Sequence, residues 1–266
     1  MRGTPMGIAM AFLGTGTCHA TPRNPSSFAI SDGTQVALID CGGGCYHQLP
    51  RIRDPRFRFD AVESVLLTHF HADHTAGLID LLWGEMWASE GPRRKPLTIA
   101  GPVGVRGFVE NRLLPFLGNY RPPFPISIVE MSNDEKHDFG FFIARAVKLA
   151  HANPSCGYRI EAGGVRLAVT GDTGYCDSLV ALLADCDVAV MEWAMPGPSD
   201  TTEHITPEAV HRLIESGHLP PVVYAVHLYC APGLSFEEQV EAHRNFLGVH
   251  ASRFRFPRDG EVFDLA

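Results

Sequence analysis

Residues 68–74 of the chain read Thr-His-Phe-His-Ala-Asp-His and come directly after the apolar run Val65-Leu66-Leu67. Three imidazoles and one carboxylate therefore lie within six positions at the predicted end of a strand, where the backbone turns into a loop. Imidazole nitrogen suits zinc, iron or manganese, and a carboxylate adds a hard, charged ligand. Histidines scattered through a core would not cluster in this way beside an aspartate, so we interpret the stretch as a metal site.

Further ligand-type residues stand downstream of this cluster. His151, Asp172 and His227 each come at the end of an apolar run of strand length. A lone histidine after a strand is more often structural than a ligand. Three such endings, in this order after the cluster, favour the ligand interpretation, because residues 68–74 alone cannot complete two metal shells.

Apolar runs of strand length alternate with helical patterns along the whole sequence. We predict strands at 7–13, 35–39, 64–68, 97–100, 126–130, 141–149, 165–170, 187–191 and 222–227. We predict helices at 75–88, 103–117, 176–185, 207–217 and 235–247. Thr206 before Pro207, and Ser235 with Glu238, are typical of helix starts. Because no repeat, low-complexity tract or linker divides the sequence, we predict one layered α/β domain over residues 1–266.

Composition limits the partners. The 266 residues are 45% hydrophobic and 20% charged, as in soluble globular proteins. The formal net charge is −8. A protein that grips a long polyanion normally has a basic patch, and the longest basic cluster here is Arg93-Arg94-Lys95, which we predict to be a solvated loop. Composition therefore disfavours a long nucleic acid as partner.

The cysteines and the apolar runs bear on location. Seven cysteines are an odd number and form no C-x-x-C pair, which favours a reducing compartment and a cytoplasmic location. Cys41 and Cys45 could bind a metal together, but without a second pair we interpret them as core residues. No apolar run approaches the roughly 18 residues of a membrane span, so we expect no membrane association. We interpret residues 6–14 as a first strand rather than a signal peptide.

With these residues the sequence resembles the metallo-β-lactamase superfamily, and within it the ribonuclease Z-like branch. The resemblance runs over nearly the whole chain. Beyond the histidine cluster it covers Leu13-Gly14-Thr15-Gly16, Arg23-Asn24-Pro25-Ser26-Ser27, Ile39-Asp40-Cys41-Gly42-Gly43-Gly44 with Gln48-Leu49, His151 with Ser155-Cys156-Gly157-Tyr158-Arg159, Met191-Glu192, Glu203-His204-Ile205-Thr206, and Asp259-Gly260. The implied fold is a four-layer αββα sandwich, with two mixed sheets packed face to face, helices outside, and metals at one edge between the sheets.

The resemblance also implies two divalent metal ions, with Zn²⁺ as the first choice and Mn²⁺ or Fe²⁺ as alternatives. The implied ligands are His69, His71 and His151 for the first ion, Asp73, His74 and His227 for the second, and Asp172 as a bridge between both. Asp40 would orient the histidine cluster through hydrogen bonds without touching a metal.

The catalytic roles follow from the same resemblance. A hydroxide that bridges the two ions would attack the substrate. Asp73 could help to hold or deprotonate this nucleophile. His204 matches the branch's extra histidine and is the candidate to protonate a leaving group or bind a phosphoryl oxygen; its alternative is a surface histidine ahead of a helix. Glu192 either orients His204 or is structural. The remaining histidines, His19 and His47 among them, have no ligand spacing.

One departure from the branch bears on the substrate. Branch members that process transfer RNA carry a long flexible arm between the third ligand and the bridging aspartate. Here His151 and Asp172 lie only 21 positions apart, which is enough for a hairpin of residues 156–161 and 165–170. We therefore expect a small-molecule substrate and doubt transfer-RNA processing.

The resulting hypothesis is a phosphodiesterase that acts on a cyclic nucleotide, a cyclic phosphate or another small phosphodiester. One alternative is hydrolysis of a lactone, a β-lactam or an aryl sulfate ester on the same fold. Another is a non-hydrolytic iron redox protein. The sequence leaves the exact substrate and the oligomeric state open, and a homodimer is compatible with each of these functions.

Overall fold

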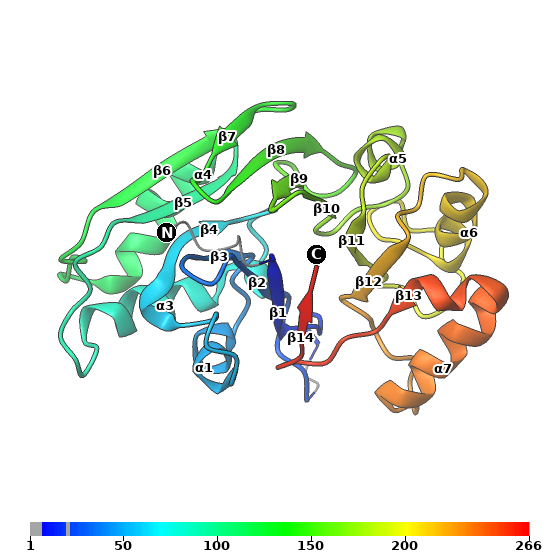
Figure 1. Cartoon of the computed structure of the whole chain (residues 1–266), viewed down its shortest axis with the longest axis horizontal. Coiled ribbons are helices and arrows are strands. Elements are labelled where there is room, and N and C mark those ends of the chain that lie inside the picture. The colour runs from blue at the N-terminus through cyan, green and yellow to red at the C-terminus, as the bar shows by residue number, and fades with distance from the viewer. Residues whose placement is uncertain (1–6, 20–21, 266) are drawn as a thin grey trace.

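The computed structural model describes residues 7–19 and 22–265 of the chain. Among these residues it has two sheets of seven strands each, which lie between two sets of helices (Figure 1). The first sheet has the order β14-β1-β2-β3-β4-β5-β6. Its strands are β1 (Ala9–Gly14), β2 (Ser27–Ser31), β3 (Val36–Ile39), β4 (Val62–Leu66), β5 (Leu97–Pro102), β6 (Ile126–Met131) and β14 (Val262–Asp264).

The second sheet has the order β13-β12-β11-β10-β9-β8-β7. Each sheet combines a parallel part, β3 to β6 or β10 to β13, with an antiparallel part. Both sheets are therefore mixed, as predicted. The strands of the second sheet are β7 (Lys136–Asp138), β8 (Phe142–Lys148), β9 (Cys156–Ala162), β10 (Val165–Val169), β11 (Val188–Glu192), β12 (Val222–Val226) and β13 (Phe254–Arg255).

The helices cover the outer faces of the two sheets. In Figure 1, α1 and α3 lie on the left and α5, α6 and α7 on the right. The α-helices are α1 (Cys45–Gln48), α2 (Ala72–Thr75), α3 (Gly77–Met86), α4 (Val105–Phe108), α5 (Asp177–Leu183), α6 (Pro207–Glu215) and α7 (Phe236–Leu247). Shorter helical segments are η1 (Leu49–Arg51), η2 (Phe59–Ala61), η3 (Val109–Leu113), which is π-helical, η4 (Leu114–Leu117) and η5 (Gly248–Arg253).

Alternation along the strands explains the layers. Successive side chains of a strand point to opposite faces, so a strand buried on both faces is apolar throughout. In β1, Ala9, Ala11 and Leu13 pack in the core under α3, whereas Met10 and Phe12 pack in the core between the two sheets. A third core lies between the second sheet and helices α5 and α6. Three stacked cores make four layers, which confirms the predicted αββα sandwich.

Local sequence signals set the helix starts that we predicted. The side chain of Thr206 accepts a hydrogen bond from the Ala209 N–H, and Pro207 occupies the first turn of α6. The Ser235 side chain and Glu238 form the capping box of α7. Both caps satisfy backbone N–H groups that the first helical turn leaves without a partner.

The predicted elements were incomplete. The strands β2, β7, β13 and β14 and the helix α1 were not predicted. The apolar run of β2 is short and lies between serines, and β7, β13 and β14 have only three, two and three residues. The helix predicted over 103–117 exists as the three segments α4, η3 and η4, and Pro115 stands in the first turn of η4. Proline has no N–H to continue an α-helical ladder, so the hydrogen-bond pattern changes before it.

The prediction of a solvated loop over residues 93–95 was wrong for Arg93. Its side chain is buried, with an ion pair of 3.1 Å to Glu85 and hydrogen bonds to the carbonyl oxygens of Val62 and Pro96. Arg94 and Lys95 are exposed, as predicted. Within the described residues, no helix is long and apolar enough to cross a bilayer.

Candidate metal centre

The predicted metal ligands all lie in segments that follow the carboxyl end of a strand, with Asp73 and His74 on the short helix α2. Strands β8, β10 and β12 run in the same direction, so the segments after them meet at one edge of the second sheet. The carbonyl oxygen of Thr68, after β4, accepts a hydrogen bond of 2.8 Å from the Cys156 N–H of β9 and joins the two sheets at that edge. The ligands are His69, His71, Asp73 and His74 after β4, His151 after β8, Asp172 after β10 and His227 after β12.

Four of these side chains form a first group. One ligand-type atom from each of His69, His71, His151 and Asp172 lies within 4.8 Å of the others. The Nε2 atoms of His69 and His151 are each 3.9 Å from Oδ2 of Asp172. Nε2 of His151 is 3.3 Å from Nδ1 of His71. The set predicted for the first ion is therefore brought together.

Asp73, His74 and His227 form a second group within the same 4.8 Å limit. Nε2 of His227 lies 3.3 Å from Oδ2 of Asp73 and 3.5 Å from Oδ2 of Asp172. Nε2 of His74 lies 3.2 Å from Oδ1 of Asp172. Asp172 thus faces both groups, as a bridging carboxylate must.

Unpartnered atoms show that the two groups fit metal ions. Nε2 of His69, Nε2 of His74 and Oδ1 of Asp172 are buried, and none has a hydrogen-bond partner in favourable geometry. A buried polar atom without a partner costs free energy, so a cation among these atoms would be stabilising. Imidazole nitrogens and a carboxylate are the donor set that zinc, manganese and iron take.

Burial and the charges of the cluster shift the pKa values of two of its histidines in opposite directions. Burial and the neighbouring His74 lower the pKa of His69 to about 2, which leaves His69 in the neutral form that a metal requires. Burial opposes charge on His74, but the carboxylates of Asp172 and Asp40 outweigh burial and hold its pKa well above the usual value. The carboxylates of the cluster therefore attract positive charge to its centre.

Hydrogen bonds at Nδ1 orient three of the histidines. Nδ1 of His69 lies 3.0 Å from Oγ1 of Thr68, and Nδ1 of His151 lies 2.9 Å from the carbonyl oxygen of Glu203. Nδ1 of His74 lies 2.7 Å from Oδ2 of Asp40. Holding Nδ1 in this way leaves Nε2 of each ring directed at Asp172, which is how outer partners fix metal-binding imidazoles.

Asp40 has the orienting role that we predicted for it. It follows β3, which runs parallel to β4, so it lies beside the start of the histidine loop. Besides His74, its carboxylate accepts bonds of 2.8 Å from the N–H and 2.9 Å from the hydroxyl of Thr68. Asp40 therefore fixes both the loop and one histidine.

His204 and Glu192 form a pair beside the two groups. Nδ1 of His204 lies 3.0 Å from Oε1 of Glu192, and a ligand-type atom of His204 lies within 4.8 Å of those of Asp172 and His227. Glu192 ends β11, is buried, and accepts bonds from the N–H groups of Thr173, Ala194 and Ile205. Burial opposes charge on His204, but Glu192 outweighs it and raises the pKa of His204. Glu192 thus both orients His204 and fastens two loops, residues 170–176 and 193–206.

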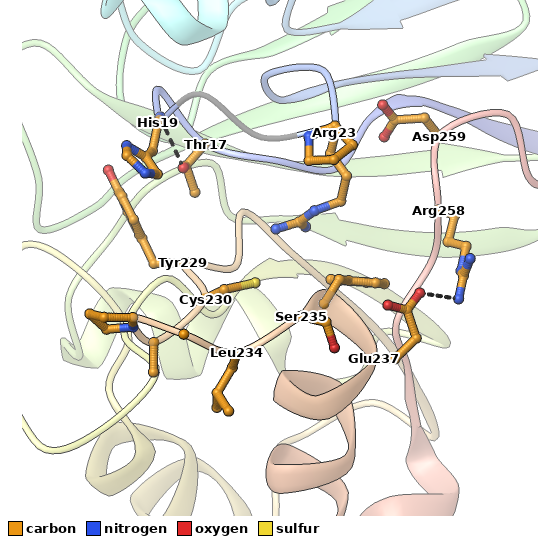
Figure 2. A pocket seen from close by; sticks show the side chains of 15 residues that line it. Thr17, His19, Arg23, Tyr229, Cys230, Leu234, Ser235, Glu237, Arg258 and Asp259 are labelled. Carbon is orange, nitrogen blue, oxygen red and sulfur yellow. Dashed lines mark hydrogen bonds and ion pairs between the residues drawn. The ribbon is translucent and has the colours of Figure 1, made fainter.

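A cavity of about 610 Å³ lies beside the second group. Tyr229 lines this cavity, and its ring centroid is 6.0 Å from that of His227. Figure 2 shows His19 and Tyr229 at one end of this cavity and the ion pair of Arg258 with Glu237 at the other. We call it the Tyr229 cavity. The pattern of ligand spacing gave no reason to single out Tyr229, which stands two positions after the last ligand.

Polar side chains of the Tyr229 cavity fasten the loop that carries His227. The Arg23 guanidinium donates to the carbonyl oxygens of Thr15 and Leu228 at 2.9 and 2.7 Å. The carboxylate of Asp259 accepts bonds from the N–H and the hydroxyl of Thr15. The carbonyl oxygen of Thr15 in turn accepts a bond of 3.0 Å from the His227 N–H. These residues therefore help to place the last ligand.

Cys41 and Cys45 lie apart from the ligand groups. Both are buried in the core under α3, and their sulfur atoms are 3.1 Å from each other. None of the cysteines belongs to a ligand group among the described residues, where all seven are free thiols. This placement supports the interpretation of Cys41 and Cys45 as core residues.

Comparison with known sequences agrees with the fold and the cluster. Residues 36–228 match the family described as the beta-lactamase superfamily domain. The chain is 33% identical over 159 residues to the ribonuclease Z of Staphylococcus carnosus, an alignment that covers 58% of this chain and 50% of the relative. The chain thus spans about half the length of the curated relatives that it matches.

Solved structures show the same fold. The metallo-beta-lactamase fold protein YhfI from Bacillus subtilis superposes with a TM-score of 0.74 at 19% identity, covering 97% of this chain and 99% of that one. The short form of human tRNase Z superposes with a TM-score of 0.74 at 20% identity and the same coverage of both chains. The chain belongs to the beta-lactamase superfamily and has the metallo-β-lactamase fold.

Proposed function

We propose that this chain is a dinuclear metal-dependent hydrolase of small phosphodiesters, such as a cyclic nucleotide or a cyclic phosphate. The observation that carries the proposal is the pair of ligand groups around Asp172, with His204 beside them. Similarity to proteins named ribonuclease Z supports phosphodiester chemistry over the hydrolysis of lactones, β-lactams or sulfate esters.

The seven predicted ligands would hold two divalent ions. In this proposal His69, His71 and His151 hold the first ion, Asp73, His74 and His227 hold the second, and Asp172 holds both. Two such ions, when bound, would lower the pKa of a water between them and stabilise negative charge on a phosphoryl oxygen. We take Zn²⁺ as the first choice because imidazole-rich sets suit it, with Mn²⁺ or Fe²⁺ as alternatives.

In this proposal Asp73 acts as the general base and His204 as the general acid. Asp73 is partly accessible and lies 3.3 Å from His227, so its carboxylate can accept a hydrogen bond from the attacking water. His204 is held through Nδ1 by Glu192, which leaves Nε2 available to donate a proton to the leaving oxygen. A base on one side of the phosphorus and an acid on the other are what hydrolysis of an unactivated ester requires.

The proposed substrate is small because the chain between His151 and Asp172 forms only the β9–β10 hairpin. The net charge of −8 also gives a long polyanion little to bind. Transfer-RNA processing, the activity for which one structural neighbour is named, is therefore the rival that experiment must exclude. A cytoplasmic location and a homodimeric state remain compatible with the proposal.

A substrate panel tests the function. Metal-replete protein would be assayed on bis-p-nitrophenyl phosphate, cyclic nucleotides, a lactone, nitrocefin and an aryl sulfate. We expect turnover of the phosphodiesters at rates well above those of the other classes. Faster turnover of the lactone, nitrocefin or the sulfate would replace the proposal with that class. No turnover, together with a visible absorption spectrum of iron, would point to redox chemistry instead.

A further inference from the structure

We propose that a second cavity, which adjoins His71, binds the base of a nucleotide substrate. This inference rests on the proposed phosphodiesterase function and names the organic group that the substrate carries. The cavity has a volume of about 580 Å³, within the range of roughly 300–1,000 Å³ that small-molecule sites occupy. Its walls include Phe70, His71, Phe108, Asn111, Arg112 and Asn153, and we call it the His71 cavity.

The His71 cavity adjoins the first ligand group through His71. His71 belongs to the first ligand group and is exposed, so one side of its ring meets the other ligands while its accessible part lines the cavity. A phosphodiester held between the two groups carries two ester substituents. In this proposal one of them extends past His71 into the cavity.

The apolar wall of the cavity suits a planar ring. Phe70 and Phe108 stack with their centroids 4.9 Å apart and 6° between their planes. Phe70 follows the predicted ligand His69, and Phe108 is the last residue of α4. Both rings are half-buried. Aromatic side chains that are partly accessible are the usual platform for a nucleobase.

The polar wall offers hydrogen-bonding groups that the fold does not use. Asn111, Arg112 and Asn153 line the cavity and are exposed, and their side chains make no hydrogen bond or ion pair to any residue in the described part of the chain. Two carboxamides and a guanidinium match the donor and acceptor edge of a base. Asn111 and Arg112 lie on the π-helical segment η3, a local geometry that is frequent at functional sites.

The Tyr229 cavity is the weaker candidate for the same role. Its polar groups already serve the fold, since Arg23 and Asp259 bind the Thr15 loop and Arg258 pairs with Glu237. A base in that cavity would compete with these bonds. The unused polar groups of the His71 cavity therefore favour it as the base site.

Two variants with a matched control test the assignment. Gly107 lines the cavity, and a Cβ added there would meet only the Nδ2 atom of Asn111, at 3.8 Å, so we use Gly107→Leu to place an apolar side chain in the cavity. Arg112→Ala removes the unused guanidinium. Arg94→Ala is the control, because Arg94 is equally exposed but precedes the amino end of β5, away from the ligand loops.

The assay compares thymidine 5′-(p-nitrophenyl phosphate) with methyl p-nitrophenyl phosphate, which share a leaving group and differ in the other ester group, a nucleoside in one and a methyl group in the other. We expect Gly107→Leu to lower the ratio of kcat/KM for the two substrates by roughly 5- to 100-fold, the value of one stacked base, and Arg112→Ala to lower it less. Arg94→Ala should leave the ratio at the wild-type value. An unchanged ratio in both cavity variants would overturn the assignment.

Calorimetric titration with AMP and with inorganic phosphate separates the two proposals. The metal-loaded cavity variants should bind AMP more weakly than wild type does and bind inorganic phosphate equally well. If wild type binds AMP more tightly than the cavity variants do but hydrolyses no phosphodiester, the phosphodiesterase proposal is wrong and the base site is supported. Equal AMP binding by wild type and both cavity variants would remove the base site alone.

Discussion

The substitution His204→Ala distinguishes three roles for His204: proton donor, metal ligand, or a residue without a part in the reaction. A general acid contributes roughly 10²–10⁴-fold to the rate, or about 2.7–5.5 kcal/mol of barrier. Glu192 is 2% exposed and is itself fixed by three backbone N–H groups, so it holds the ring of His204 in one orientation. Because the donor is held in place, we expect a loss in the upper part of this range for an alkyl phosphodiester.

The assay compares that alkyl diester with bis-p-nitrophenyl phosphate. A p-nitrophenolate leaves with little protonation, so His204→Ala should slow its release by less than about 10-fold. His211→Ala is the control, because His211 is exposed on α6 and pairs only with Glu215. Equal, few-fold losses on both substrates would show that the acid lies elsewhere. A fall in metal content would instead make His204 a ligand, in line with its distance from Asp172 and His227.

Asp40→Asn should weaken metal binding by roughly 10- to 100-fold, because the variant loses the negative charge that orients His74. Competition with a chromogenic chelator measures the affinity, and an affinity equal to that of the wild type would contradict the orienting role of Asp40. Glu85→Ala should lower the free energy of unfolding, measured by urea denaturation, by about 3 kcal/mol, because Arg93 then keeps a buried charge without its ion-pair partner. A loss under about 1 kcal/mol would mean that the hydrogen bonds from Arg93 to the carbonyl oxygens are enough to stabilise its charge. Cleavage of a precursor transfer RNA should be absent or very slow, and efficient, salt-sensitive cleavage would refute the small-substrate proposal.

The grouping of the candidate ligands was predictable because each candidate is marked by its local sequence. A ligand-type residue at the end of an apolar run can be recognised from the local sequence. Strands that run in the same direction bring their carboxyl ends to the same edge of a sheet. His151, Asp172 and His227 were found in this way. Their division between two ions came from the family resemblance, and the structure places the same residues in two groups.

Features made from distant segments were not predictable in this way. The His71 cavity is built from residues near positions 70, 110 and 153, and nothing in any one of these segments points to the other two. Arg93 looked like part of a solvated basic run, because the sequence does not show that the carbonyl oxygens of Val62 and Pro96 surround its guanidinium. Local patterns identify chemical groups, whereas packing decides which of them meet.

Metal analysis of the purified protein tests the central claim most directly. Elemental analysis under metal-replete conditions should find two divalent ions per chain in the wild type. Asp172→Ala should lower both occupancies, because its carboxylate faces both groups, whereas His151→Ala should empty mainly one. Fewer than about one ion per chain in the wild type, or equal losses in the two variants, would contradict the dinuclear centre.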